Sequence, residues 1–360
     1  MNRLRDIWTE IVGFENLHAA YRAARRGKSS RTDVIQFSLE LEDRLVALQE
    51  RLLDGSWRPG GYRQFTVYER KPRVISAASF EDRVVHHAVM RVVEPVLDRR
   101  FSPDSFACRR GKGVHAALDQ YQRLASRFAY VVHLDIRKYF PSIDHALLKA
   151  ALWRRIDDRR TLAVIESIID ASPDDKSGPQ YFAGDDLFTP LARRQGIPIG
   201  NLTSQFFANL YLDDFDHWLR QDLRVPGYVR YVDDFLMLAD SAAFLMDAAD
   251  AVSSRLASLR LRLHEGTIHV RRTSEKVPVL GFQISRTRRW LRAENGYRFR
   301  RRYHRMARRY AAGRQSLQAA ARSAVAWSGH ACHGETKMLR AAIFNEVVFR
   351  RGVEASPSAG

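Results

Sequence analysis

The sequence predicts an α+β fold, because short segments with the composition of paired strands lie between longer segments with helical periodicity. Residues 62–76 and residues 228–239 each have the pattern of two strands joined by a tight turn. Apolar residues three and four positions apart indicate helices before, between and after these two hairpins. With 360 residues, of which 45% are hydrophobic, the chain has enough material for a core in one to three domains.

The chain is strongly basic, with a formal net charge of +18 and a sequence pI of about 10.3. This charge predicts a polyanionic partner, and nucleic acid is favoured over a membrane surface because no amphipathic, Trp-flanked segment stands out. The two cysteines, Cys108 and Cys332, are far apart and imply no disulfide framework. Because no signal peptide or membrane-spanning run is apparent, we expect a cytoplasmic protein with no membrane partner.

Residues 1–55 are expected to be helical and charged. Two apolar stripes support this expectation: Phe14, Leu17, Ala20 and Tyr21, then Phe37, Leu41, Leu45 and Leu48. Between the stripes, the basic stretch Arg22–Arg31 is either a solvated connection or a contact for a nucleic-acid backbone.

After a turn-rich break at residues 54–61, the first hairpin has a basic tip that contains Lys71 and Arg73. Such a tip is either solvated or able to close over phosphate groups. A helix with a broad apolar face is predicted over residues 80–97. Tyr130–Ile136 then has the near-continuous apolar pattern of a buried strand, with Asp135 near its end. This acid is either a salt-bridged edge residue or a ligand at the surface of a sheet.

Downstream, we expect a helix from about residue 145, a surface loop over residues 171–184, and one long helix that ends near residue 220. The pair Asp213-Asp214 is expected on a polar end of that helix. A helix over residues 242–259 and a strand over residues 279–284 follow the second hairpin. From Arg286 onward the chain is rich in Arg with interleaved aromatic residues, which is typical of a helical nucleic-acid contact.

The second hairpin carries adjacent carboxylates, Asp233 and Asp234, and we expect Val232 and Asp233 in or near its turn. Such a pair is compatible with an ordinary solvated turn, but it is costly to bury unless a cation such as Mg²⁺ compensates its charge. Asp135 supplies a third carboxylate in a matching setting. Two metal ions held by these acids could clamp the attacking and leaving oxygens of a phosphoryl transfer. Together with the basic composition, this predicts nucleotidyl transfer on a polynucleotide.

Several motifs, in order along the chain, give it a resemblance to reverse transcriptases. Tyr231-Val232-Asp233-Asp234 resembles the family's catalytic box, and Asp135–Phe140 resembles its other catalytic-aspartate box. Lys71–Ile75 resembles the fingers motif that grips the incoming triphosphate, Ser105–Gly113 resembles the next block, and Leu280–Phe282 resembles the primer grip. The resemblance covers about residues 55–345. It implies a right-hand polymerase with fingers, a palm built on an antiparallel sheet, and a helical thumb.

The resemblance also implies a metal centre and a domain organisation. Asp135 and Asp233 would be the main ligands of two Mg²⁺ ions, for which Mn²⁺ could substitute. Asp234 would complete the site, and the carbonyl of Ile136 would assist. The implied domains are a helical extension (residues 1–55), fingers and palm with the catalytic site (56–285), a basic helical thumb (286–350) and a tail (351–360).

The nucleotide site is implied in the same way. Lys71 and Arg73 would hold the triphosphate. Phe140 falls where the family places a steric gate, so that a ribose 2′-OH would be excluded and deoxynucleotides preferred.

The run Ile199–Gln205 narrows the resemblance. Most retroviral, group II intron and retron enzymes have Gln-Gly, three residues and then Ser-Pro here, whereas this chain has Ile199 in place of the Gln and Gln205 in place of the Pro. This pattern, together with Trp327–Ala331, resembles the reverse transcriptases of diversity-generating retroelements. Errors at template adenine in that group are attributed partly to this segment, and Ile199 would lack a hydrogen-bonding group beside the incoming nucleotide. The implied partners are template RNA, the RNA/DNA duplex, deoxynucleoside triphosphates and a small basic accessory protein that forms a barrel-like oligomer.

The chain departs from the family at residues 264–267, where a Lys usually follows a Leu-x-Leu-His-type stretch. Protonation of the leaving pyrophosphate by that Lys is therefore in doubt, and His264 and His269 are the candidates to replace it. Two alternative functions stay open: a defence-associated bacterial reverse transcriptase, and an inactive polymerase scaffold that binds nucleic acid. The intact acids Asp135, Asp233 and Asp234 argue against the inactive scaffold.

Overall fold

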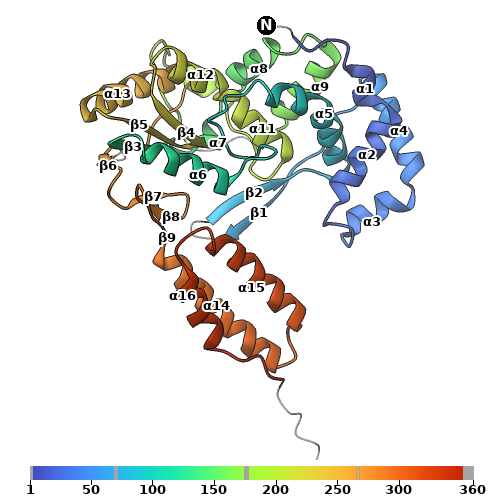
Figure 1. Ribbon diagram of the computed structural model, residues 1–360. Helices are drawn as coiled ribbons and strands as arrows, with labels where there is room; N and C mark the ends of the chain where they lie inside the picture. The colour runs from blue at the N-terminus through green and yellow to red at the C-terminus, as the bar shows by residue number, and fades with distance from the viewer. Residues whose placement is uncertain (1–2, 69–71, 174–177, 265, 267, 352–360) are drawn as a thin grey trace, which may run out of the picture. The chain divides into compact units, whose positions relative to one another are not determined.

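The computed structural model describes residues 3–68, 72–173, 178–264, 266 and 268–351 (Figure 1). By its internal contacts the chain divides into two compact units. The first unit comprises Met1–Gly113, His133–Met237 and Met246–His269, and the second comprises Val114–Val132, Leu238–Leu245 and Val270–Gly360. Among the described residues, no helix combines the length and the apolar character needed to cross a membrane.

The first unit begins with the predicted helices, α1 (Trp8–Val12), α2 (Phe14–Arg25), α3 (Thr32–Leu39) and α4 (Leu41–Leu53). α1, α2 and α3 pack against the longer helix α5 (Phe80–Asp98), as the blue part of Figure 1 shows. The apolar stripes form these contacts, because Leu17, Tyr21 and Phe37 are all buried. α5 begins where expected, and the hydroxyl of Ser79 caps it by accepting a hydrogen bond of 3.0 Å from the backbone N–H of Asp82.

The first hairpin is confirmed as β1 (Arg63–Tyr68) paired antiparallel with β2 (Pro72–Ala77). Its register places Arg63 opposite Ala77 and Tyr68 opposite Pro72. Residues 69–71 at the tip lie outside the described residues, so the structure does not place Lys71. Arg73 lies in β2, opposite Val67.

A sheet with the strand order β4-β5-β3-β6 contains the predicted buried strand, β3 (Tyr130–Asp135), and the second hairpin, β4 (Gly227–Tyr231) with β5 (Asp234–Ala239). β6 (Val270–Arg272) pairs antiparallel with the first half of β3. Val132, Val229 and Leu236 are buried, as expected for strands covered on both faces. Together with the helices, these antiparallel pairings confirm the α+β class.

Helices α7 (Tyr139–Ser142), α8 (His145–Trp153), α9 (Arg159–Asp170), α10 (Thr189–Ala192) and α13 (Ala242–Ser258) connect these strands. The prediction of one long helix that ends near residue 220 is wrong. The chain forms two helices, α11 (Leu202–Tyr211) and α12 (Asp213–Gln221), with a non-helical residue, Leu212, between them. Acidic side chains in a first turn favour a new helix start, and α12 begins with Asp213, Asp214 and Asp216. Asp213 is also not on a polar surface: it is buried and bonded to Arg155 at 2.9 Å.

The second unit contains α6 (Val114–Ala125) and a three-stranded antiparallel sheet of β7 (Val277–Val279), β8 (Phe282–Ile284) and β9 (Arg289–Leu291). The single strand predicted over residues 279–284 is wrong, because Leu280 and Gly281 have φ values of 44° and 88° and form a turn between β7 and β8. The helical segment expected from residue 286 begins later, since β9 first pairs with β8.

Helices α14 (Ala293–Ala311), α15 (Leu317–Ala331) and α16 (Lys337–Asn345) complete the second unit. Their aromatic residues form its apolar centre, where the rings of Phe299 and Trp327 stack with centroids 4.0 Å apart and Phe344 packs against both rings edge-on. The indole N–H of Trp327 donates to the side-chain oxygen of Asn295 at 2.9 Å. The aromatic residues of this basic segment are therefore partly structural.

We expect acid to destabilise the first unit through His86, which lies on the buried face of α5 with no partner for Nε2 among the described residues. Burial, followed by the charges of His87 and Arg83, lowers the pKa of His86 from 6.5 to about 3. Because the pKa in the folded state lies below that in the unfolded state, stability is intact above pH 6.5 and is lost as the pH falls from 6.5 toward 3. Each pH unit in this window costs about 1.4 kcal/mol.

The measurement is urea unfolding at pH 7 and pH 5 for the wild type and for His86→Leu. The loss of unfolding free energy between the two pH values should be about 2 kcal/mol smaller in the variant. His269→Leu, which changes an exposed histidine, is the matched control and should keep the wild-type pH dependence. An equal pH dependence in wild type and His86→Leu would contradict the assignment.

Candidate active site

The acidic pair lies where the second hairpin turns. β4 ends at Tyr231 and β5 begins at Asp234, so Val232 and Asp233 form the turn, as predicted. Val232 has a φ of 60°, in the left-handed region that β-branched residues rarely adopt. The turn therefore holds an unusual backbone conformation directly before Asp233.

The end of β3 lies beside this turn. The backbone N–H of Ile136 donates to the carbonyl of Asp233 at 3.2 Å, and the backbone N–H of His264 donates to the carbonyl of Asp135 at 2.8 Å. Ile136 also forms an antiparallel bridge with Leu263. These bonds join backbone atoms from three segments that are far apart in the sequence and bring Asp135 next to Asp233.

The electrostatics of the turn fit a cation site. The pKa of Asp233 is raised from 3.8 to about 6, mainly by burial and also by the negative charges of Asp135 and Asp234, while the positive charge of Arg73 acts to lower it. The acids expected to act together therefore do interact, and the charge of Arg73 from the first hairpin acts on Asp233. A bound divalent cation would relieve the same repulsion.

The carboxylate of Asp234 has a partner that sequence reasoning did not find. Its Oδ1 lies 2.9 Å from Nε2 of His133, which shares one face of β3 with Asp135 because the two are two residues apart. Within the described chain, no group of three or more His, Cys, Asp and Glu side chains is arranged to hold a metal ion. Asp135 and Asp233 remain as a pair, and one or two protein carboxylates plus substrate phosphates are what Mg²⁺ typically takes.

The segment at Ile199 is attached to β2. The backbone N–H of Ser76 donates to the carbonyl of Ile199 at 3.3 Å. The side chain of Asn201 donates to the carbonyl of Ser76 at 3.0 Å, and its oxygen accepts from the N–H of Ala78 at 3.5 Å. No local sequence pattern indicates this role of Asn201, because its partners lie more than 120 residues away.

Phe140 and Gln205 complete the residues predicted for nucleotide binding. Phe140 lies half-buried on α7, and its carbonyl accepts a hydrogen bond of 3.0 Å from the N–H of Ile197, two residues before Ile199. Gln205 is exposed on α11, whereas its neighbours Ser204 and Phe206 are buried. The structure thus links Phe140, Ile199 and the strand that carries Arg73 through backbone hydrogen bonds, and it exposes Gln205.

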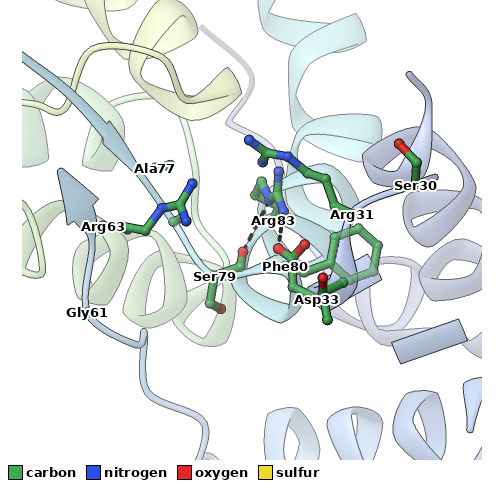
Figure 2. Close-up of a pocket in the computed structure, with 11 residues that line it drawn as sticks. Ser30, Arg31, Asp33, Gly61, Arg63, Ala77, Ser79, Phe80 and Arg83 are labelled. Atoms are coloured by element: carbon green, nitrogen blue, oxygen red, sulfur yellow. Dashed lines mark hydrogen bonds and ion pairs between the residues drawn. The ribbon is translucent and has the colours of Figure 1, made fainter. Parts of the chain in front are cut away.

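A separate pocket of about 630 Å³ is lined by basic residues of the first unit, as Figure 2 shows. Arg31 precedes α3, Arg63 begins β1, and Arg83 lies on α5. Arg83 pairs with Asp33 at 3.1 Å. The basic stretch predicted near the N-terminus thus ends at a pocket with more positive than negative side chains in its lining.

Comparison with known proteins identifies relatives of the chain. The family model described as reverse transcriptase (RNA-dependent DNA polymerase) matches residues 64–284, which is more than half of the chain. Protein YkfC of Escherichia coli strain K12 is 23% identical over 295 residues, which cover 71% of this chain and 74% of that protein.

Two further relatives come from mobile elements. The group II intron-encoded protein LtrA of Lactococcus lactis subsp. cremoris is 24% identical over 213 residues, which cover 58% of this chain and 33% of that protein. The retrovirus-related Pol polyprotein from type-1 retrotransposable element R2 of Popillia japonica is 26% identical over 239 residues, covering 62% and 32% respectively. The matched region thus spans about a third of the length of each of these two proteins.

The close approach of Gly200 to β2 gives a prediction. Gly200 has a φ of 109°, and a Cβ atom there would lie 2.9 Å from Cγ2 of Ile75. Gly200→Ala should therefore lower the free energy of unfolding by about 1–3 kcal/mol, because it adds a clash to a strained backbone.

Thermal or urea unfolding of Gly55→Ala is the matched control. Gly55 also has a positive φ, 76°, but nothing lies within 4 Å of its Cβ position. The loss in Gly200→Ala should exceed that in Gly55→Ala, and equal losses would mean that Gly200 is needed only for its backbone conformation.

Proposed function

The chain belongs to the reverse transcriptase family of RNA-dependent DNA polymerases, and from this membership we propose that it synthesises cDNA on an RNA template at Asp135 and Asp233. The observation that carries the proposal is the backbone hydrogen bond between Ile136 and Asp233, which joins the two predicted catalytic segments. Membership implies a polymerase palm, which β3, β4 and β5 would form. The division into extension (1–55), fingers and palm (56–285), thumb (286–350) and tail (351–360) is part of the proposal.

The proposed metal ligands are Asp135 and Asp233, with Asp234 and the carbonyl of Ile136 as additional oxygen donors. The pKa of Asp233, raised to about 6 by burial and by the neighbouring carboxylates, supports this choice because a cation would favour the ionised acid. Two Mg²⁺ ions bound there would neutralise charge on the transferred phosphate and polarise its oxygens. The chain itself would place the acids through the turn at Val232 and keep Asp234 oriented through His133.

The incoming nucleotide is proposed to lie between the first hairpin and the turn of the second. Arg73, whose charge reaches Asp233, would hold the triphosphate, and Lys71 would assist. Phe140 would exclude a ribose 2′-OH, in agreement with its position on the short helix after β3. The backbone of His264 is hydrogen-bonded to that of Asp135, which holds His264 near the proposed metal site. His264 would donate the proton to the leaving pyrophosphate.

RNA is the proposed template, and the net charge of +18 supports it. Within the first unit, Arg31, Arg63 and Arg83 around the pocket offer contacts to phosphate (Figure 2). In the second unit, α14 presents exposed arginines beside the packed aromatic residues. A small basic accessory protein oligomer is part of the proposal through the resemblance alone.

We further propose that synthesis is error-prone at template adenine, as in diversity-generating retroelements. Ile199 and Gln205 support this role by their residue types, and the attachment of Ile199 to β2 supports a position near the nucleotide. An apolar residue there removes one hydrogen bond from discrimination between correct and wrong pairs.

The first test is incorporation of deoxynucleotides on a primed RNA template with Mg²⁺. Asp233→Ala should abolish incorporation and leave RNA affinity within a few-fold, because the substitution removes a proposed metal ligand and leaves the basic surface intact. Asp214→Ala, from the other Asp-Asp pair, is the matched control and should retain incorporation. Synthesis by Asp233→Ala would remove the catalytic assignment.

A second test reads the error spectrum of the product by sequencing. Ile199→Gln should lower misincorporation opposite adenine by several-fold, because it restores a hydrogen-bonding side chain beside the nucleotide. Ile199→Val keeps an apolar side chain and should keep the wild-type spectrum. An unchanged spectrum in Ile199→Gln would reject this role, and accurate synthesis by the wild type would favour the defence-associated enzyme.

A further inference from the structure

A buried arginine of β4 is hydrogen-bonded to the turn that carries Asp233. Arg230, in β4, is 1% exposed, and its guanidinium forms hydrogen bonds in three directions. Nε and Nη2 donate to the carboxylate of Asp216 at 2.6–3.0 Å. Nη1 donates to the side-chain oxygen of Asn209 at 3.3 Å and to the backbone carbonyl of Val232 at 3.1 Å.

The bond to Val232 is the one that reaches the turn. The carbonyl of Val232 is part of the peptide group that links Val232 to Asp233. The orientation of this carbonyl therefore determines the backbone orientation at Asp233. Val232 has a φ of 60°, which is unfavourable for a β-branched residue unless surrounding bonds determine it. Arg230 supplies one such bond, and Ile136 supplies another by donating to the carbonyl of Asp233.

Asp216 holds the guanidinium in the orientation that this bond requires. Its side chain is fully buried, and it accepts a further hydrogen bond of 2.7 Å from the hydroxyl of Tyr228. A buried ion pair is weak evidence for stability, because apolar residues of similar size often serve a core equally well. The bond from Arg230 to the carbonyl of Val232 is the contact of this pair that reaches the turn, and apolar side chains could not form it.

We propose that Arg230, oriented by Asp216, is a positioning residue that fixes the Val232–Asp233 peptide so that the carboxylate of Asp233 faces the reacting phosphate. The proposal rests on the polymerase function of Asp233. Arg230 acts through backbone geometry and touches neither substrate nor metal. Its effect should therefore appear in kcat and in the mobility of the turn, and not in the binding of RNA or nucleotide.

The decisive variant replaces both charges at once, Arg230→Met with Asp216→Leu. It leaves no unpaired buried charge and removes the bond to Val232. The matched control is Arg155→Met with Asp213→Leu, which replaces another buried ion pair between an arginine and an aspartate of α12, bonded at 2.9 Å. Arg230→Lys is the conservative variant, because it keeps the positive charge but lacks the fork that reaches Asp216 and Val232 together.

Steady-state incorporation should show a fall in kcat of about 10–100-fold for Arg230→Met/Asp216→Leu, since small misplacements of a reacting group have effects of this size. The KM for deoxynucleotide and the affinity for primed RNA should each change less than about threefold, as expected for a loss confined to the chemical step. The control pair should retain the wild-type kcat. Equal kcat in the folded double variant and the wild type would overturn the proposal.

Hydrogen–deuterium exchange of residues 231–236 provides a measurement that needs no polymerase activity. Exchange there should become faster in Arg230→Met/Asp216→Leu and in Arg230→Lys, and should stay at the wild-type rate in the control pair. Unchanged exchange would overturn the positioning role. If circular dichroism shows that the double variant is unfolded, kcat and hydrogen–deuterium exchange are measured for Arg230→Lys instead, and the same outcomes support or overturn the proposal.

The two proposals can fail separately. A wild-type protein that incorporates no nucleotide defeats the proposed function, whatever the exchange rates. An active wild type with equal kcat and equal turn exchange in the folded variants defeats the positioning role and leaves the proposed function in place.

Discussion

Carboxylates that lie close together in a partly buried turn repel one another, and the arrangement of the first unit depends on how this repulsion is contained. Burial is the largest cause that raises the pKa of Asp233 to about 6, and the neighbouring carboxylates add to the shift. The strands that carry the acids are joined by backbone bonds at Ile136 and His264, which use no carboxylate oxygen of Asp135 or Asp233. The fold thus brings the acids together with main-chain hydrogen bonds.

Local patterns were sufficient to predict the elements that carry the site. β3, the two hairpins and α5 lie within a residue or two of their expected bounds, because each has a periodicity and flanking signals confined to a few neighbouring residues. Two predictions are wrong, the single helix that ends near residue 220 and the single strand over residues 279–284, because a few residues interrupt a longer pattern in each. The acids Asp213, Asp214 and Asp216 are typical of a helix start and indicate one after Leu212. Gly281 likewise indicates a turn inside a run of strand-forming residues.

The supporting contacts could not be predicted, because they join residues that are distant in the sequence. Asp234 contacts His133, which lies 101 residues away in the sequence, and Asn201 contacts Ser76, which lies 125 residues away. Arg230 is a charged residue inside an apolar strand, where an unpaired charge is costly. Which of the 41 acidic residues is its partner depends on how α12 packs, and only the structure identifies Asp216.

The segment at Ile199 is attached to β2 by its backbone and by Asn201. The bond between the N–H of Ser76 and the carbonyl of Ile199 joins backbone atoms, and the second link is made by the side chain of Asn201. The side chain of Ile199 takes part in neither. Gly200 between them allows the close approach, since any larger residue would meet Ile75. The attachment of the segment therefore depends on backbone atoms and on Asn201, and in the proposed function the side chain of Ile199 is left to contact the nucleotide.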